Sequence, residues 1–509
     1  MKVSQDGDDR SPWTVSEQKP FMIVPSETSE QKPFMIVPSE TTSNPVVSGK
    51  ERPGIFPLPL TPLEQFLFQC DTAASPMIIR IVLRLTGEAD LECLKETLLS
   101  AIGRHPLATC RITGNGNQSC WIHGPPAKID ICHLAGSIFE PDGGPTRKKI
   151  NLRIENGLHA EIHIMDDGIK VVIDAHHAVT DGNGLRQIVT EWFHLYHCQI
   201  TGVASRLPVL DSDRLQQRHH FPAPAAAAPI GLREAIRNLL VTIRGRTARW
   251  TLRRETTSES SSSQIGYCVE RILSQEQYDH VQLRLEQWKV TLNDLMLATC
   301  MSTFAKMAPA GHMKHLITIL NPTDLRLPSD RRLPAANRFG FAFIRRPRAT
   351  CVNPAALLKG IHDEMHYVRS NYIGAEFIKG LASASRIPGG VDLIRKLGLF
   401  IPSLQWTCLG DITRGGKRLM TWKDGAIFLG ELRLETVTGF APFADNVPLS
   451  IATCETGRRI TLTVQANSRF MNESETKAFA LAIEDMICSF ELPPTDSEAS
   501  DRRKDENAD

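Results

Sequence analysis

Two adjacent histidines, His176 and His177, are the residues of this chain best suited to carry out chemistry. An imidazole has a pKa near neutrality, so it can take a proton from a hydroxyl or an amine and later return it. Asp181 and Gly182 follow closely, which completes the spacing His-His-x-x-x-Asp-Gly. This pattern predicts a general base on a short loop, with an acidic residue and a glycine behind it.

Two other interpretations of the histidine pair were weighed. Adjacent residues at the end of a strand point in different directions, and the sequence places no third ligand nearby, so we expect no metal site. The pair can also be a structural group whose hydrogen bonds are satisfied inside the fold, as is common for a histidine near an aspartate.

The elements on both sides of the pair favour the catalytic interpretation. Residues 170–173 form a β-branched run typical of a buried strand, and the turn at 166–168 joins it to an alternating strand at 159–165. After Gly182 an apolar face recurs at helical spacing, through Leu185, Ile188, Val189, Trp192, Phe193 and Tyr196. A loop held between a strand and a helix is a rigid support for a base.

Residues 176–182 resemble the signature of the acyltransferases that use coenzyme A (CoA) or a carrier protein. That superfamily includes peptide-synthetase condensation domains, polyketide-associated acyltransferases, alcohol acetyltransferases and the plant BAHD enzymes. The resemblance implies that His177 is the catalytic base, and that Asp181 is turned away from the substrate and paired with an arginine. We add the backbone N–H of Gly182 as a donor to the oxyanion.

Further segments carry the same resemblance, which covers about residues 57–490. The helix beginning Thr-Leu-Asn-Asp-Leu-Met-Leu-Ala at 291–298, the strand that leads to Arg326 and the Asn-Arg-Phe-Gly segment at 337–340 occur in the order seen in that superfamily. The resemblance makes Arg326 the candidate partner of Asp181, and Asn337 and His176 supporting residues.

The chain departs from the superfamily pattern in two places. Thr407 and Cys408 stand where relatives often carry Ser-Asn, which puts in doubt any role of that asparagine. The Asp-Phe-Gly-Trp-Gly segment of condensation domains has no good match, and residues 438–443 lie near its place. This second departure favours a stand-alone transferase over a peptide-synthetase domain.

The resemblance implies an α/β fold made of two chloramphenicol-acetyltransferase-like subdomains with mixed sheets and helices, and an active-site channel between them. We expect an enzyme that moves an acyl group from a CoA or carrier-protein thioester to the hydroxyl or amine of a small molecule, without a bound cofactor. Three alternatives stay open: a condensation or release catalyst that docks with a carrier protein, a non-catalytic binding protein of the same fold, and a membrane-associated lipid transferase.

Composition limits the partners and the compartment. The formal net charge is +1 over 509 residues, which gives no general attraction to nucleic acid. The 12 cysteines are scattered without zinc spacing or a disulfide framework, and the polar N-terminus has no secretory apolar core. We expect reduced thiols, a cytoplasmic location and a monomer.

The chain is predicted to fall into five parts. Residues 1–50 form a disordered tail in which 16–28 and 29–41 are identical copies, and 492–509 form a second disordered tail. Between them lie an N-terminal subdomain at 51–205, an Ala/Pro- and Ser-rich linker at 206–264 and a C-terminal subdomain at 265–491. The linker includes a basic amphipathic segment at 232–254, which either packs between the subdomains or contacts a membrane surface.

Overall fold

In a computed structural model the structure describes residues 54–73, 75–139, 149–221, 247–248, 250, 266–309, 315–391, 401–414, 416–442, 444 and 446–490. Local sequence signals place several helix starts within this part. Helices α1 (Pro62–Cys70), α5 (Gln275–Trp288) and α6 (Leu292–Met307) each begin with a capping box, whose N-caps are Thr61, Ser274 and Thr291. In each box a side chain satisfies a backbone N–H group that the first helical turn leaves unpaired.

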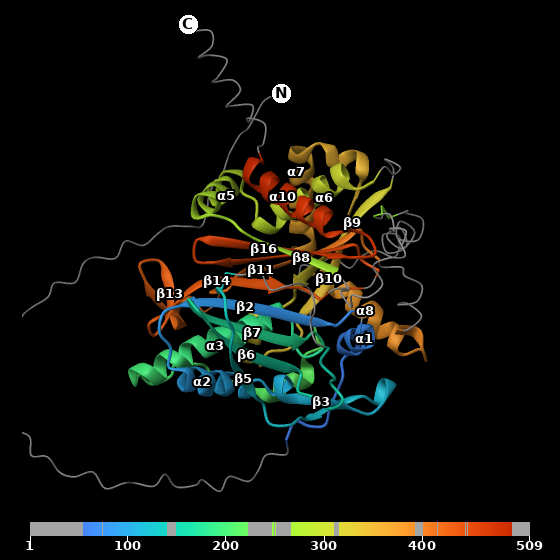
Figure 1. Cartoon of the computed structure of the whole chain (residues 1–509). Coiled ribbons are helices and arrows are strands. Elements are labelled where there is room, and N and C mark those ends of the chain that lie inside the picture. Colours follow the sequence, from blue (N-terminus) through green and yellow to red (C-terminus); the bar gives the residue numbers. More distant parts are fainter. Residues whose placement is uncertain are drawn as a thin grey trace, which may run out of the picture. The chain divides into compact units, whose positions relative to one another are not determined.

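A seven-stranded sheet positions the histidine pair (Figure 1). Its strand order is β12 (Thr421–Lys423), β13 (Ala426–Leu429), β14 (Leu432–Phe440), β2 (Ile78–Thr86), β7 (Gly168–His176), β6 (Leu158–Met165) and β5 (Ile129–His133). Strand β7 is an interior strand, antiparallel to both β2 and β6, and buried along most of its length. The hairpin predicted between β6 and β7 is present. Helices α2 (Leu91–Gly103) and α3 (Gly182–Thr201) contact each other, and their apolar residues join the same hydrophobic cluster as this sheet.

A six-stranded sheet carries the second half of the site. Its order is β10 (Phe339–Pro347), β9 (Leu316–Asp324), β11 (Leu404–Asp411), β15 (Leu449–Thr456), β16 (Arg459–Asn467) and β8 (Gly266–Ile272). Strand β11 runs parallel to β9 and β15, and the other pairs are antiparallel, so the sheet is mixed. Helices α6, α7 (Pro354–Ser370) and α10 (Glu473–Ser489) share the hydrophobic cluster of this sheet.

A smaller sheet and one helix complete the surroundings of the site. The three-stranded sheet has the order β1 (Leu58–Pro59), β4 (Cys120–His123) and β3 (Cys110–Thr113). Helix α8 (Gly374–Ser385), which the sequence did not predict, contacts α1 and β10. The fold is therefore the mixed α/β arrangement that the sequence predicted.

Strands β12, β13 and β14 come from the second half of the chain but extend the sheet of the first half. Strand β14 pairs with β2 from Arg433 opposite Thr86 to Phe440 opposite Arg80, an exchange that the sequence did not predict. A buried ion pair also joins the halves: Arg84 on β2 and Glu270 on β8 lie 2.7 Å apart, with side chains 1% and 8% exposed. The predicted segments 51–205 and 265–491 thus share a sheet and a buried ion pair.

Several predictions fall outside the described residues. They are the tails at 1–50 and 492–509 and most of the basic segment at 232–254, of which the structure describes residues 247, 248 and 250. Within the described residues, no helix combines the length and the apolar character needed to cross a bilayer. All 12 cysteines are described, and none forms a disulfide.

Candidate functional site

His177 lies in the tight connection between the end of β7 and the start of α3. Its backbone N–H donates to the carbonyl of Met77 (2.7 Å), which continues the pairing of β7 with the segment before β2. Its ring nitrogen Nδ1 lies 3.2 Å from the carbonyl oxygen of Thr180. A carbonyl can only accept, so this bond places the proton on Nδ1 and leaves the lone pair of Nε2 available.

The ring of His177 is also held from the side. It stacks on Phe339 at the start of β10, with centroids 4.9 Å apart and planes 18° from parallel. Among the described residues, His177 Nε2 has no hydrogen-bond partner, and the ring borders two cavities. Burial lowers the pKa of the His177 imidazole, and the nearby negative charge of Asp181 opposes this shift. The site therefore holds a neutral imidazole in one orientation, as a general base requires.

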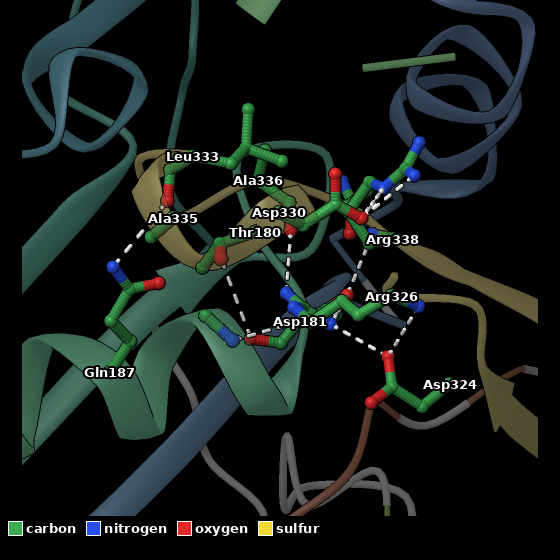
Figure 2. Close-up of polar contacts among 12 residues, drawn as sticks. Thr180, Asp181, Gln187, Asp324, Arg326, Asp330, Leu333, Ala335, Ala336 and Arg338 are labelled. Atoms are coloured by element: carbon green, nitrogen blue, oxygen red, sulfur yellow. Dashed lines mark hydrogen bonds and ion pairs between the residues drawn. The ribbon is translucent and has the colours of Figure 1, made fainter. Parts of the chain in front are cut away.

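Asp181 differs from His177, because both of its carboxylate oxygens accept hydrogen bonds from other residues, among them Arg326 (Figure 2). As N-cap of α3 it accepts from the Gly184 N–H (2.8 Å), and it also accepts from the Arg338 N–H (2.8 Å). Arg326 binds it bidentately, at 3.0 and 2.7 Å. The predicted pair of Asp181 and Arg326 is present in the structure.

The electrostatics of this pair favour the charged forms. Burial alone favours the neutral acid, yet the charge and hydrogen bonds of Arg326, together with the two backbone N–H donors, lower the pKa of Asp181. Burial also opposes the charge of Arg326, but the carboxylates of Asp181 and Asp324 raise its pKa above the ordinary value. The pair ties the start of α3 to the segment after β9 and so joins the two sheets at the site.

Asn337 holds the histidine loop by its backbone. Its side-chain amide donates to the carbonyls of His177 (2.8 Å) and Ala178 (2.9 Å). Gly182 is the first residue of α3, where a Cβ atom would come within 2.5 Å of Leu409 Cδ2. Both predicted residues therefore lie at the loop, with Asn337 fixing its path and Gly182 permitting a close approach by β11.

His176 differs from His177 because it is fully buried and lines neither of the two cavities. Its Nδ1 accepts from the Ala178 N–H (3.0 Å), so the proton lies on Nε2, which faces Asp71 Oδ2 at 3.7 Å. Asp71 also accepts from the Met77 N–H (2.9 Å) and pairs with Lys149 (2.9 Å). These contacts make His176 a structural anchor of the loop.

The sequence did not reveal Asp71 or Phe339 as site residues. Asp71 follows α1 and is more than 100 positions from His176, so no local spacing points to it. Phe339 lies within the Asn-Arg-Phe-Gly segment that the sequence singled out at 337–340. That segment was a usable signal, because its phenylalanine is the ring against which His177 stacks.

The two cavities on either side of His177 differ in chemistry. One, of about 290 Å³, is mainly apolar, and its lining includes Phe66, Phe341, Phe343, Phe377, Met77 and Trp406. The other, of about 240 Å³, also has apolar side chains in its wall but is more polar than the first, and its lining includes Asn183, Arg186, Asn293, Asp324 and Arg414; it is called the polar cavity below. His177, Pro322, Thr407, Ala441 and Pro442 line both. A side chain that borders two cavities can be reached by two reactants, one from each cavity.

Hydroxyl and thiol groups also border the cavities, although they are distant from His177 in the sequence. Cys70, Thr72 and Ser75 line the apolar cavity, and Cys408 lines the polar one. No described hydroxyl or thiol forms a hydrogen bond with His177. Burial raises the pKa of the Cys408 thiol, which keeps it in its less nucleophilic form. Among the described residues, no group of three His, Cys, Asp or Glu side chains is placed to hold a metal ion.

Comparison with solved structures places the chain in a known fold class. Its fold is that of condensation-domain and acyltransferase-like proteins, with sequence identities of only 11–15% for the matches considered. No protein-family model matches the sequence, and a search of curated proteins found no match. The likeness is therefore one of fold.

Three of these structures illustrate the range of the class. Polyketide synthase associated protein 5 from Mycobacterium tuberculosis matches with a TM-score of 0.58 and 15% identity, over 85% of this chain and 97% of that chain. The trichothecene 15-O-acetyltransferase from Fusarium sporotrichioides matches with a TM-score of 0.58 and 12% identity, over 84% and 94%. The first condensation domain of the calcium-dependent antibiotic synthetase, in complex with a substrate analogue, matches with a TM-score of 0.60 and 14% identity, over 85% and 96%.

Proposed function

We propose that this protein is an acyltransferase that moves an acyl group from a CoA or carrier-protein thioester to the hydroxyl or amine of a small molecule. The observation that carries the proposal is the orientation of His177. Its Nδ1–H is committed to the Thr180 carbonyl, its Nε2 has no described partner, and it lies between two cavities of different polarity.

The reaction follows from this geometry. Nε2 of His177 takes the proton of the acceptor hydroxyl or amine, whose heteroatom then attacks the thioester carbonyl. The tetrahedral intermediate expels the thiolate, which receives the proton from the imidazolium. The backbone N–H of Gly182, in the wall of the polar cavity, is our candidate donor to the oxyanion. A ternary complex makes an acyl-enzyme unnecessary, because the cavities hold both reactants together.

The apolar cavity supports a substrate with a bulky hydrophobic part. Phe377 makes edge-to-face contacts with Phe66 (5.8 Å between centroids) and Phe341 (5.1 Å). Such a wall gains its binding energy by removing apolar surface from water, at roughly 25 cal/mol per Å². We assign this cavity to the hydrophobic body of the acceptor or to the acyl chain, in a cytoplasmic monomer that needs no bound cofactor.

A second candidate is a condensation or release catalyst that receives its substrates on a carrier protein. The fold supports it, because solved condensation domains and a condensation-like cyclization domain beside a docking domain are among the matches. The two candidates share the chemistry at His177 and differ in the thioester carrier.

The test is a thiol-release screen of wild type and His177→Ala with a panel of acyl-CoAs and acyl-carrier proteins, each with pooled alcohols and amines. Loss of a general base lowers the rate by about two to four orders of magnitude. His177→Phe is a matched variant that keeps a flat ring against Phe339 but cannot take a proton. Thioester-dependent product at near wild-type rate in both variants contradicts the proposal, and turnover with carrier-protein donors alone selects the second candidate.

A further inference from the structure

The lining of the polar cavity includes two arginines, Arg186 and Arg414. Arg186 extends from α3, and Arg414 lies just beyond the end of β11. Neither guanidinium forms an ion pair with any carboxylate among the described residues, and the one hydrogen bond seen for the Arg186 side chain goes to the backbone carbonyl of Asp411 (3.2 Å).

The carboxylates around these arginines have other partners. Asp324 pairs with Arg326 at 3.1 Å, and Arg326 is shared with Asp181. Asp411 accepts two hydrogen bonds from Thr413, each 2.8 Å long, from its backbone N–H and its hydroxyl.

Glu455 does not line this cavity, and although the charge of Arg414 lowers the pKa of its carboxyl, other effects outweigh it. Its side chain accepts from Gln282 (3.2 Å), and burial followed by the charge of Asp411 raises the pKa of the carboxyl. A carboxyl with a raised pKa is a weaker counter-charge for an arginine than an ordinary one.

The cations also repel one another. Burial, followed by the positive charges of Arg414 and Arg326, lowers the pKa of Arg186, while Asp324 opposes the shift. A half-buried guanidinium beside like charges costs stability, and an anion bound there would remove that cost. Within the described residues, neither Arg186 nor Arg414 therefore has a carboxylate as an ion-pair partner.

We propose that Arg186 and Arg414 form a binding site for an anionic group of a substrate, on the polar side of His177. The group is a phosphate on the arm of the thioester carrier or a carboxylate on one of the two reactants. A guanidinium suits both, since its planar N–H fork matches either anion in a bidentate way. At about 240 Å³ the cavity is below the ~300–1,000 Å³ usual for a whole ligand, so it fits one arm of the substrate.

The proposal of an anion site rests on the proposed acyltransferase function, which determines the choice of probes. Binding is measured directly, without turnover, so that the anion site and the acyltransferase function are tested separately. Calorimetric titrations at low salt use CoA as the phosphate-bearing probe, pantetheine as its uncharged counterpart and succinate as the carboxylate probe. The variants are Arg186→Gln, Arg414→Gln and their combination. Arg433→Gln is the control, because Arg433 is an exposed arginine on β14 and does not line the cavity.

A phosphate site predicts that each substitution weakens CoA binding about tenfold, the effect of losing one charged hydrogen bond. Pantetheine should bind all variants equally, and Arg433→Gln should behave as wild type. Weakened succinate binding with unchanged CoA binding assigns the site to a carboxylate instead and also supports it. Equal affinity of wild type and the double variant for both anionic probes, or no binding of either probe to wild type at millimolar concentration, overturns it.

Two further measurements separate this site from the rest of the protein. The double variant should keep the wild-type melting temperature or exceed it, because it removes repelling charges and breaks no ion pair among the described residues. His177→Ala should retain CoA affinity while losing turnover. Retained turnover in His177→Ala together with weakened CoA binding in the double variant would refute the general-base mechanism and leave the anion site standing.

Discussion

Replacing Asp181 with alanine should reduce the free energy of unfolding by about 3–5 kcal/mol, the cost of breaking a buried ion pair by removing one partner. The carboxylate is 7% exposed and its partner Arg326 is 22% exposed. Loss of the N-cap of α3 accounts for about 1 kcal/mol. The orphaned N–H of Arg338 adds roughly 1–3 kcal/mol, and the stranded charge of Arg326 accounts for the rest.

The change is measured by urea denaturation and calorimetry. The entropy of unfolding is about 2.1 cal/mol/K per residue, so a chain of this size loses roughly 1 °C of melting temperature for each kcal/mol. Asp181→Ala should therefore melt about 3–5 °C below wild type. Asp181→Asn should lose less, because asparagine is a good N-cap and keeps an acceptor for the Arg338 N–H.

Two control variants isolate the ion pair. His177→Ala leaves every partner of Asp181 in place and should melt as wild type does. Asp324→Ala removes the other carboxylate bound to Arg326. Because the Asp324 side chain is 48% exposed, this change should lower the free energy of unfolding by less than about 1 kcal/mol. Because the pKa of Asp181 is lowered from 3.8, its contribution is present above about pH 4 and is lost as the pH falls through the folded-state pKa. Equal stability of Asp181→Ala and His177→Ala at pH 7 would refute this reasoning.

Three more predictions follow from the site and the chain. Because burial lowers the pKa of His177 from 6.5, the acid limb of the kcat/KM profile should lie below pH 6.5, and a limb above that value would contradict a desolvated imidazole. Direct attack by the acceptor predicts sequential kinetics, and intact-mass analysis with thioester alone should show no acyl adduct; a stoichiometric adduct that reacts on adding acceptor would redirect attention to Cys70, Thr72 or Ser75 in the apolar cavity. Deleting residues 1–45, which contain the repeated segment, should leave turnover and melting temperature nearly unchanged, and a large loss of either would show that the repeat contributes to the folded body.

Local signals located many elements correctly because they act over a few residues. The helix predicted to begin in the segment at 291–298 is α6, which has Thr291 as its N-cap. The strand predicted to lead to Arg326 is β9, which extends to Asp324 because its pairing with β10 continues across Pro322 to the last residue. The length over which two strands pair depends on the tertiary structure and cannot be predicted from residue types alone.

The position of β12, β13 and β14 in the seven-stranded sheet is a larger example of strand pairing that the sequence did not predict. Nothing in the sequence of residues 421–440 specifies a partner strand. Only the folded chain brings β14 beside β2, more than 300 positions away, where buried apolar side chains from both strands meet in one cluster. A period-two pattern identifies a strand face and leaves its neighbour undetermined.

The sequence by itself determined the motif at 176–182, the strand and helix that hold it, and the candidate residues His177, Asp181 and Arg326. Tertiary structure decided which groups each one contacts. It placed the proton of His177 on Nδ1 through a backbone carbonyl and brought the distant Asp71 beneath His176. It also set cavities of different polarity on the two sides of His177. The position of the proton and the polarity of the cavities depend on atoms that meet only when distant segments pack together. The sequence could therefore identify His177 as the candidate base, but it could not identify its hydrogen-bond partner or the cavities beside it.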